Sequence, residues 1–281
     1  SIAQRLSRDT ATGGSLILTT PSDTTLVSFN SLALSKKEIR VNRFAVIIDA
    51  GNAEPKSVLT GTKIDADSWL TYLRSLRGGA WYPHEISVLT NPSKFSVQTA
   101  LRKTGIDFFL VAFSGHGYVS SETKLSCGVL KDGDLSEVDL TPQCDRSVLV
   151  MDSCRLIEKK RLTESVAFAT ATMNESDDIQ AHRKLFNLEL GRVQFAKYRI
   201  FGCDFGQVSN ENARGGLFTS ALIAAGNTAS NSVVSIKSAF DIAKIQVQAR
   251  EPTQVPTMQS PRVVDHLPFG VSAGLKKFNT R

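Results

Sequence analysis

The chain has few cysteines, and none is spaced like a zinc ligand or part of a disulfide framework. Cys127, Cys144, Cys154 and Cys203 form no CxxC pair in 281 residues. This spacing argues against structural zinc and against a disulfide-stabilised secreted fold. Isolated thiols instead fit a reducing compartment, where one of them can act as a nucleophile. We therefore expect no structural metal and a cytoplasmic location.

Long apolar runs are also missing. No segment approaches the roughly 20 apolar residues that a membrane-spanning helix needs, and the N-terminal residues lack the pattern of a signal peptide. Hydrophobic residues make up 41% of the chain and charged residues 21%, which is typical of a globular protein with a buried core. We expect no membrane partner.

The excess of positive charge is small and spread along the chain. There are 33 Lys and Arg residues against 27 Asp and Glu residues, a net charge of +6. Such a balance favours anionic partners. A nucleic-acid platform, however, would need a basic stripe interleaved with aromatic residues, and the sequence has none. Nucleic acid is therefore not an expected partner.

Strand-like and helix-like segments alternate from Arg43 onward. A short apolar run predicts a buried parallel strand at 44–49, and similar segments predict further strands at 85–90, 108–113, 147–151 and 198–203. Apolar residues at helical spacing predict helices at 65–76, 94–104, 216–225 and 235–249. This alternation predicts a doubly wound α/β fold with a mostly parallel central sheet.

Two segments do not follow the alternation. Residues 1–40 are rich in Ser and Thr, with a hairpin predicted at 15–19 and 25–29, and we treat them as an N-terminal extension of unknown role. Residues 41–281 then form the main domain. The charged stretch 156–193 is either a long connection or an inserted helix pair.

Two chemically reactive residues follow neighbouring predicted strands. His116 comes after the strand at 108–113, and Cys154 after the strand at 147–151. Ligands of an open parallel sheet gather beyond the carboxyl ends of its strands, so an imidazole and a thiol there suit nucleophilic catalysis. The imidazole matters because the thiolate is the reactive form of cysteine.

Each of the two residues also has a simpler explanation. A cysteine after a strand is commonly a small buried residue, and a histidine in a glycine-rich turn is commonly structural. Their occurrence at two equivalent strand ends favours a catalytic pair. The N–H groups of Gly117 and Cys154 would then bind the developing oxyanion, an effect of about 3 to 4 kcal/mol per donor.

Five segments resemble motifs of the caspase-like cysteine peptidases, and they are nearer to metacaspases and their bacterial relatives than to animal caspases. Two of them carry the reactive residues: FSGHG at 113–117 and VMDSCR at 150–155. The others are LTGTKID at 59–65, GCDFGQVSNE at 202–211 and GGLFT at 215–219. Thr62 stands where many metacaspases have Cys. The resemblance spans about residues 43–250 and implies a three-layer α/β/α sandwich.

The resemblance also implies a substrate pocket. Where animal caspases carry Gln-Ala-Cys, this chain has Asp152-Ser153-Cys154. In metacaspase-type enzymes, acids at the positions of Asp152 and Asp65 line the pocket for a P1 Arg or Lys. Buried paired carboxylates are costly without a cation, so they select one. By the same resemblance Ser114 lines this pocket and Asp204 lies on its opposite wall. The alternative for Asp65 is a helix N-cap.

These features together predict a cysteine endopeptidase specific for Arg or Lys, acting on a protein or peptide substrate. No organic cofactor is implied. Many metacaspases need calcium, but the best calcium candidates in the sequence, Glu175, Asp177 and Asp178, also fit a solvated loop. Two other functions remain open: a catalytically silent binding or scaffold module, and a thiol hydrolase or amidotransferase that does not cut peptides.

Control of such a peptidase is a further question that the sequence raises. Bacterial relatives often serve as effectors in antiviral defence or programmed death, activated by a protein or a small signalling ligand. The segment RLIEKKR at 155–161 carries four basic residues close to Cys154. It is either a self-cleavage site or a solvated basic loop.

Overall fold

The computed structural model describes residues 6–7, 15–20, 23–27, 40–53, 58–157, 177–212, 215–229, 233–261 and 266–272. The chain divides into two units, Ser1–Ile39 and Arg40–Arg281. The first contains an antiparallel sheet of three strands, β1 (Leu6–Ser7), β2 (Ser15–Thr20) and β3 (Asp23–Val27), in sequence order. Strands β2 and β3 form the predicted hairpin, and β3 begins two residues earlier than expected.

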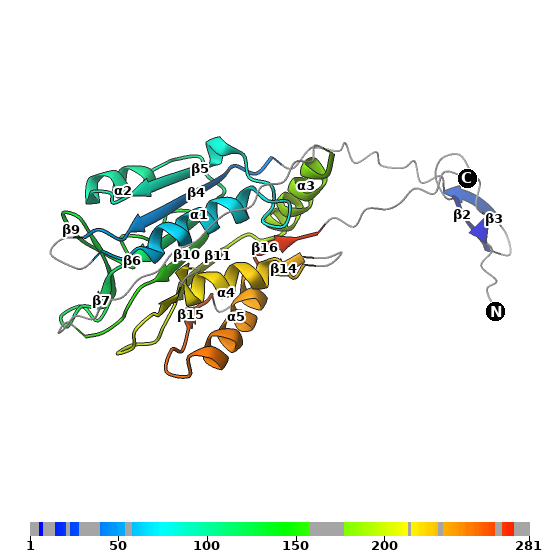
Figure 1. The fold of residues 1–281 in the computed structure, drawn as a ribbon. Coiled ribbons are helices and arrows are strands. Elements are labelled where there is room, and N and C mark those ends of the chain that lie inside the picture. The colour runs from blue at the N-terminus through cyan, green and yellow to red at the C-terminus, as the bar shows by residue number, and fades with distance from the viewer. Residues whose placement is uncertain are drawn as a thin grey trace. The chain divides into compact units, whose positions relative to one another are not determined.

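The second unit is built around a six-stranded sheet of order β15-β11-β10-β6-β4-β5 (Figure 1). Its strands are β4 (Arg43–Ala50), β5 (Ile86–Thr90), β6 (Phe108–Gly115), β10 (Arg146–Asp152), β11 (Ala196–Phe201) and β15 (Thr257–Gln259). All pairs are parallel except β11 with β15. The five strands predicted from the sequence are therefore confirmed, and β15 at the edge is an addition.

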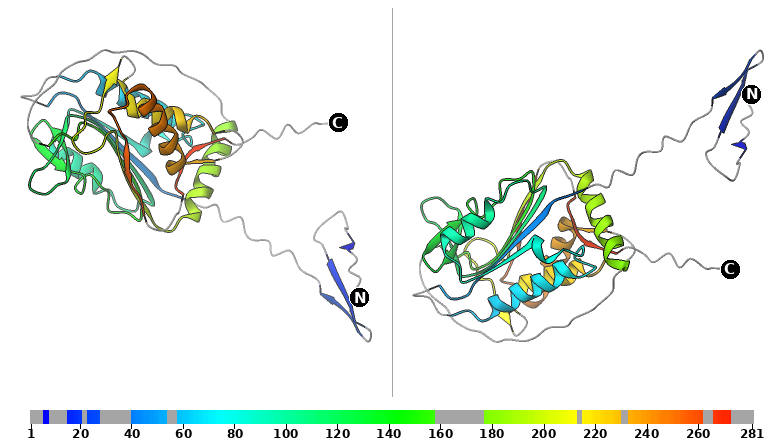
Figure 2. Two further views of the ribbon diagram at one scale, coloured as in Figure 1. Left: turned by 90° about the horizontal axis from the view of Figure 1, so that it is seen from below. Right: turned by 90° about the horizontal axis from the view of Figure 1, so that it is seen from above.

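Helices cover both faces of this sheet (Figure 2). They are α1 (Gly61–Arg74), α2 (Lys94–Leu101), α3 (Asp177–Arg192), α4 (Leu217–Gly226) and α5 (Ile236–Arg250). Alternate residues of the strands enter two cores, because successive side chains of a strand point to opposite faces. One core joins the sheet to α1, α3, α4 and α5, and the other joins it to α2. The predicted three-layer α/β/α sandwich is confirmed.

Several short strands were not predicted from the sequence. A second antiparallel sheet consists of β7 (Gly117–Val119), β8 (Ser126–Leu130) and β9 (Gly133–Ser136). Two further pairs are β12 (Glu211–Asn212) with β13 (Gly215–Gly216), and β14 (Val233–Ser235) with β16 (Pro268–Val271). A 3-10 turn spans Pro83–Glu85. These segments are too short, and too rich in glycine and polar residues, to give a strand signal.

The stretch 156–193 contains one described helix, α3, while residues 158–176 lie outside the described part of the chain. Helix α3 packs through the buried ring of Phe186 and through Arg183, whose guanidinium contacts Glu85 Oε2 at 2.7 Å. In the described residues no helix is both long and apolar enough to cross a membrane.

Candidate active site

The sheet brings His116 and Cys154 to one rim. Strands β6 and β10 are parallel neighbours, and Ser114 pairs with Asp152 at the last position of the ladder. His116 and Cys154 each follow two residues after this pair. A Cβ atom added to Gly117 would lie 2.5 Å from Ser153 Oγ and 2.9 Å from the carbonyl oxygen of Cys154. The turn after His116 therefore packs directly on the segment that carries the thiol.

The backbone of β7 turns the amide of Gly117 toward the same segment. The N–H of Val129 donates to the carbonyl oxygen of His116 at 2.9 Å, so Gly117 and its partner Gly128 form a non-hydrogen-bonded pair of the antiparallel ladder. The N–H of Gly117 thus points away from β8, as does that of Val119. Val119 donates to the carbonyl oxygen of Leu156 at 3.0 Å, two residues beyond the thiol.

A pair of buried carboxylates lies beside this rim. Asp65 is 2% exposed and accepts hydrogen bonds from the Ser114 hydroxyl and, at 2.8 Å, from the Gly216 N–H. Asp152 is 6% exposed and accepts from the Ser209 hydroxyl. Thr219 donates to Asp152 through its N–H at 2.9 Å and its hydroxyl at 2.7 Å. The structure therefore brings together Asp65, Asp152 and Ser114, the residues that the resemblance groups in one place; their role as a substrate pocket stays a prediction.

Burial dominates the electrostatics of this pair. It raises the pKa of Asp65 well above its usual range, and the neighbouring charge of Asp152 raises it further. Burial likewise raises the pKa of Asp152, although hydrogen bonds from Ser209 and Thr219 oppose the shift. In the part of the chain that the structure describes, no Lys or Arg side chain forms an ion pair with either carboxylate. A basic ligand would relieve both desolvation and mutual repulsion.

Glycine backbone fills the space around the two acids. A Cβ atom at Gly216 would lie under 3.0 Å from carboxylate oxygens of both Asp152 and Asp65. One at Gly202 would lie 2.6 Å from Asp152 Oδ1 and 2.7 Å from Ser209 Oγ. The carboxylates are thus only a few ångströms apart, and side chains at these two positions would displace them.

A third carboxylate, Glu211, completes the acidic group, and the sequence did not single it out. Burial and the charge of Asp152 raise the pKa of Glu211. One of its oxygens lies beside the backbone of Gly61, at the start of α1. The other, Oε1, is buried and has no hydrogen-bond partner among the described residues. An acceptor of this kind is available to a ligand that carries several N–H donors.

The acidic group does not have the arrangement of a metal site. Among the described residues, no three His, Cys, Asp or Glu side chains converge closely enough to hold a metal ion. The calcium candidates remain a prediction. Glu175 lies outside the described residues, and the side chains of Asp177 and Asp178, at the start of α3, are also outside them.

Comparison with known proteins identifies the family of this fold and site. The model of the caspase domain matches residues 42–267. The chain belongs to the caspase domain family. Among solved structures, caspase-1 from Spodoptera frugiperda is similar, with a TM-score of 0.53 and 17% identity over 83% of this chain and 92% of that chain. At this identity the likeness concerns the fold. A comparison with proteins of curated function found no match.

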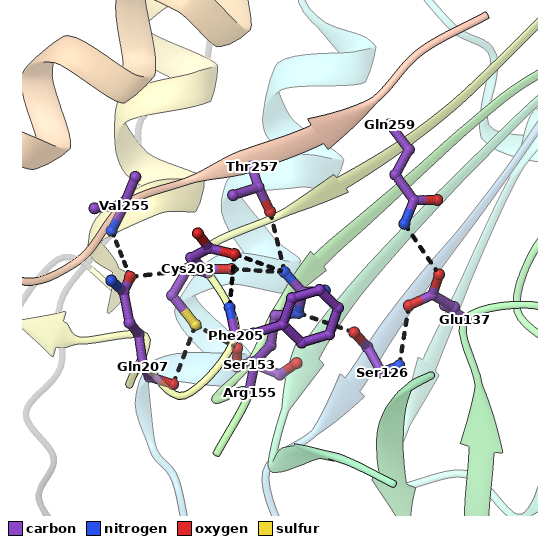
Figure 3. Close-up of polar contacts among 11 residues, drawn as sticks. Ser126, Glu137, Ser153, Arg155, Cys203, Phe205, Gln207, Val255, Thr257 and Gln259 are labelled. Carbon is purple, nitrogen blue, oxygen red and sulfur yellow. Dashed lines mark hydrogen bonds and ion pairs between the residues drawn. The ribbon is translucent and has the colours of Figure 1, made fainter. Parts of the chain in front are cut away.

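In this caspase domain, Arg155 anchors the segment that follows the thiol (Figure 3). Its guanidinium is 2% exposed and donates to Ser126 Oγ at 2.9 Å, to the carbonyl oxygen of Cys203 at 3.1 Å and to Thr257 Oγ1 at 3.0 Å. It also lies over the rings of Phe201 and Phe205. Burial lowers the pKa of Arg155. This first basic residue of segment 155–161 is thus a core residue, and Lys159, Lys160 and Arg161 lie outside the described residues.

Asp204, expected on the opposite wall of the pocket, faces this arginine instead. Its Oδ1 lies 4.0 Å from an Arg155 nitrogen and accepts a hydrogen bond from the N–H of Phe205 at 2.7 Å. The buried cation of Arg155 attracts a carboxylate from the nearest loop, and Asp204 is the acid that the turn presents to it. The structure does not join Asp204 to Asp65 and Asp152.

The alternative role of Asp65 as a helix N-cap is wrong. Helix α1 begins at Gly61, with Thr60 at its cap, so Asp65 lies in the second turn with its side chain directed at Ser114 and Gly216. Ser209 and Thr219, which hold Asp152, were not recognised individually in the sequence. Both lie within segments resembling the family, 202–211 and 215–219, and that resemblance was their only signal.

Proposed function

We propose that this caspase domain is a cysteine endopeptidase that cleaves after Arg or Lys. The observation that carries the proposal is the buried pair Asp65 and Asp152, whose raised pKa values and lack of a basic partner in the described chain suit a cationic P1 side chain. A pocket built for Asp would instead present cations.

The proposed reaction proceeds through a thioester. The Cys154 sulfur attacks the carbonyl carbon of the P1 residue, while His116 takes the thiol proton. The oxyanion of the tetrahedral intermediate accepts hydrogen bonds from the N–H groups of Gly117 and Cys154. The carbon–nitrogen bond then breaks, and the amine leaves with the proton from His116. Water, deprotonated by His116, attacks the thioester and releases the acid and the thiol.

The pocket would recognise the substrate by charge and by hydrogen bonding. An Arg or Lys side chain placed between Asp65 and Asp152 lowers the pKa of both carboxyls, so binding would release protons to solvent. Oε1 of Glu211, which has no hydrogen-bond partner among the described residues, supplies one further acceptor. A guanidinium has five N–H donors and an ammonium has three, so Glu211 favours Arg over Lys.

The resemblance to metacaspases and their bacterial relatives supports the same specificity. We also propose that the enzyme is a regulated effector of defence or cell death that acts in the cytoplasm. Two other functions compete with this proposal. A silent scaffold would retain the fold without hydrolysis, and a thiol hydrolase of another kind would not need paired acids beside the nucleophile.

A P1 profile with fluorogenic peptides separates these functions. The peptides carry Arg, Lys, citrulline, Gln or Asp at P1 and are otherwise identical; Cys154→Ala serves as the blank. The proposal predicts cleavage after Arg and Lys, with citrulline, which is a neutral isostere of Arg, cut at least tenfold more slowly. Cleavage after Asp or Gln would contradict the pocket assignment, and no cleavage above the blank by an activated chain would favour the scaffold.

A further inference from the structure

Gln254 is a fully buried polar side chain behind the acidic group. It lies in the turn between α5 and β15 and is 0% exposed. Its Oε1 accepts from the backbone N–H of Asn210 at 3.0 Å and from Asn210 Nδ2 at 3.2 Å. Its Nε2 donates to the carbonyl oxygen of Gly202 at 2.8 Å and to Ser209 Oγ at 3.1 Å.

The two backbone partners determine which way the amide of Gln254 points. A backbone N–H can only donate and a carbonyl oxygen can only accept, so Oε1 must face Asn210 and Nε2 must face Gly202. Ser209 Oγ therefore accepts a hydrogen bond from Nε2. A hydroxyl has one proton, and that of Ser209 is then directed at its other near neighbour, Asp152 Oδ1.

We propose that Gln254 is a positioning residue for P1 specificity: it aligns the Ser209 hydroxyl as a donor to Asp152 and fixes the loop that carries Ser209 and Asn210. The inference rests on the proposed function, because it assigns Asp152 to the pocket for a basic side chain. Gln254 itself touches neither substrate nor thiol, and it acts through Ser209.

Because Ser209 donates to Asp152, the Asp152 carboxyl ionises at a lower pH than it would if burial acted alone. The bond from Ser209 lowers the pKa of Asp152 and opposes the effect of desolvation. Without Gln254, the hydroxyl is no longer held in the donor orientation, and Asp152 becomes charged only at higher pH. Selection of Arg over its neutral isostere should follow the charge of Asp152, and so depend on Gln254.

Gln207 provides a matched control. It is a second glutamine that bridges the same two loops: its Oε1 accepts from the N–H of Asp204 at 3.1 Å and of Val255 at 2.8 Å (Figure 3). Like Gln254, it joins the loop after β11 to the turn before β15, where its partner Val255 directly follows Gln254. Among its described hydrogen bonds, however, none reaches Ser209 Oγ or Asp152. Loss of loop bracing alone should affect both glutamine variants, whereas loss of Ser209 alignment should affect only one.

The experiment measures the ratio of kcat/KM for the Arg peptide to kcat/KM for the citrulline peptide, at pH values from about 5 to about 9. Gln254→Met should lower this ratio about 3- to 10-fold near neutral pH, which is the range expected for loss of one hydrogen bond. The pH at which the ratio increases should also be higher in this variant. Gln207→Met should keep the ratio and its pH dependence. In a Ser209→Ala background, Gln254→Met should cause no further change, because the two residues act as a unit.

A second measurement decides the inference even if Gln254→Met folds poorly or the chain cuts no basic peptide. The ¹³C carboxyl signal of Asp152 is titrated in the Cys154→Ala protein, with Asp152→Asn for assignment. Asp152 should titrate at higher pH in Gln254→Met, and also in Ser209→Ala, which leaves Gln254 in place. Unchanged titration in either variant, or an equal fall of the selectivity ratio in Gln207→Met, would overturn the inference. If the titration of Asp152 shifts as expected but the enzyme does not distinguish Arg from citrulline, only the proposed function is overturned.

Discussion

Asp65 and Asp152 reach the same point of the structure from distant parts of the chain. Asp65 lies on α1 and Asp152 ends β10, and carboxylate oxygens of both lie within 3.0 Å of where a Cβ atom of Gly216 would be. The two acids are buried; burial raises the pKa of both carboxyls, and the charge of Asp152 raises that of Asp65 further. Such an arrangement stores an unfavourable free energy that a bound cation relieves.

The first prediction concerns the reactive pair. Cys154→Ala and His116→Ala should each lower kcat by at least about 10³-fold, because each removes a group that takes part in bond making or proton transfer. The melting temperature should change little, since Cys154 is only partly buried. Appreciable hydrolysis by either variant, measured beside the parent on the same Arg peptide, would contradict the assignment.

The second prediction concerns the charge of the pocket. Asp152→Asn should raise KM and lower kcat/KM for Arg and Lys peptides by about 10- to 100-fold, while citrulline peptides are affected far less. Glu211→Gln should lower the preference for Arg over Lys and leave the preference for basic over neutral residues intact. Steady-state kinetics on the three peptides measures both effects.

Asp204→Asn is the matched control for this charge. It removes an acid from the same loop, but one that faces Arg155. Its ratio of Arg to citrulline cleavage should equal that of the parent. A loss of selectivity in Asp204→Asn as large as in Asp152→Asn would place Asp204 in the pocket after all.

The third prediction is a pH dependence of stability. The folded protein holds a proton on Asp65 at pH values where the unfolded chain, with an ordinary Asp pKa of about 4, has lost it. The folded state therefore binds more protons, and the free energy of unfolding falls as pH rises from about 4 through the raised pKa. Asp65→Asn removes this slope, so its stability relative to the parent should increase with pH.

Urea denaturation at several pH values measures this difference. Asp67→Asn, on the same helix but in an exposed ion pair with Lys63, controls for the loss of one negative charge. The stability difference between Asp65→Asn and the parent should grow from about pH 5 to about pH 8. If it does not, the folded protein does not hold the Asp65 carboxyl in its protonated form.

The fourth prediction concerns control of activity. If the connection after the thiol is a self-cleavage site, fragments ending at Lys159, Lys160 or Arg161 should appear on incubation of the parent and be absent from Cys154→Ala. No fragment should end at Arg155, since its guanidinium is buried and bonded to Ser126 and Thr257. Mass spectrometry of the products distinguishes these cases. An intact chain with full activity would leave a ligand or partner as the means of control.

The sequence predicted β4, β6 and β10 most clearly, because these strands are buried along nearly their whole length and so appear as continuous apolar runs. It also predicted the rim, since the carboxyl ends of neighbouring parallel strands bring His116, Cys154 and Ser114 to one edge. Strands β7, β8 and β9 escaped prediction. They are short and interrupted by glycine and polar residues, so none of them has an apolar run or a clear alternation of its own.

The environment of the acids could not be predicted in the same way. Ser209 and Thr219 reach Asp152 from loops and helix ends that have no periodicity, and only tertiary packing brings them there. The segment 202–211 carries two acids, and the sequence could not tell which turns inward. Asp204 lies near the buried guanidinium of Arg155, whereas Glu211, in the β12–β13 pair, lies beside Gly61 at the start of α1.

Covalent labelling tests the central claim most directly. A peptidyl-Arg acyloxymethyl ketone is incubated with the protein, and the labelled residue is mapped by mass spectrometry beside the citrulline and Asp versions of the same probe. The account predicts one label, on Cys154, from the Arg probe, and a strong reduction with the other two probes and in His116→Ala. A label on Cys127, Cys144 or Cys203, or equal labelling of Cys154 by the Arg and citrulline probes, would contradict it.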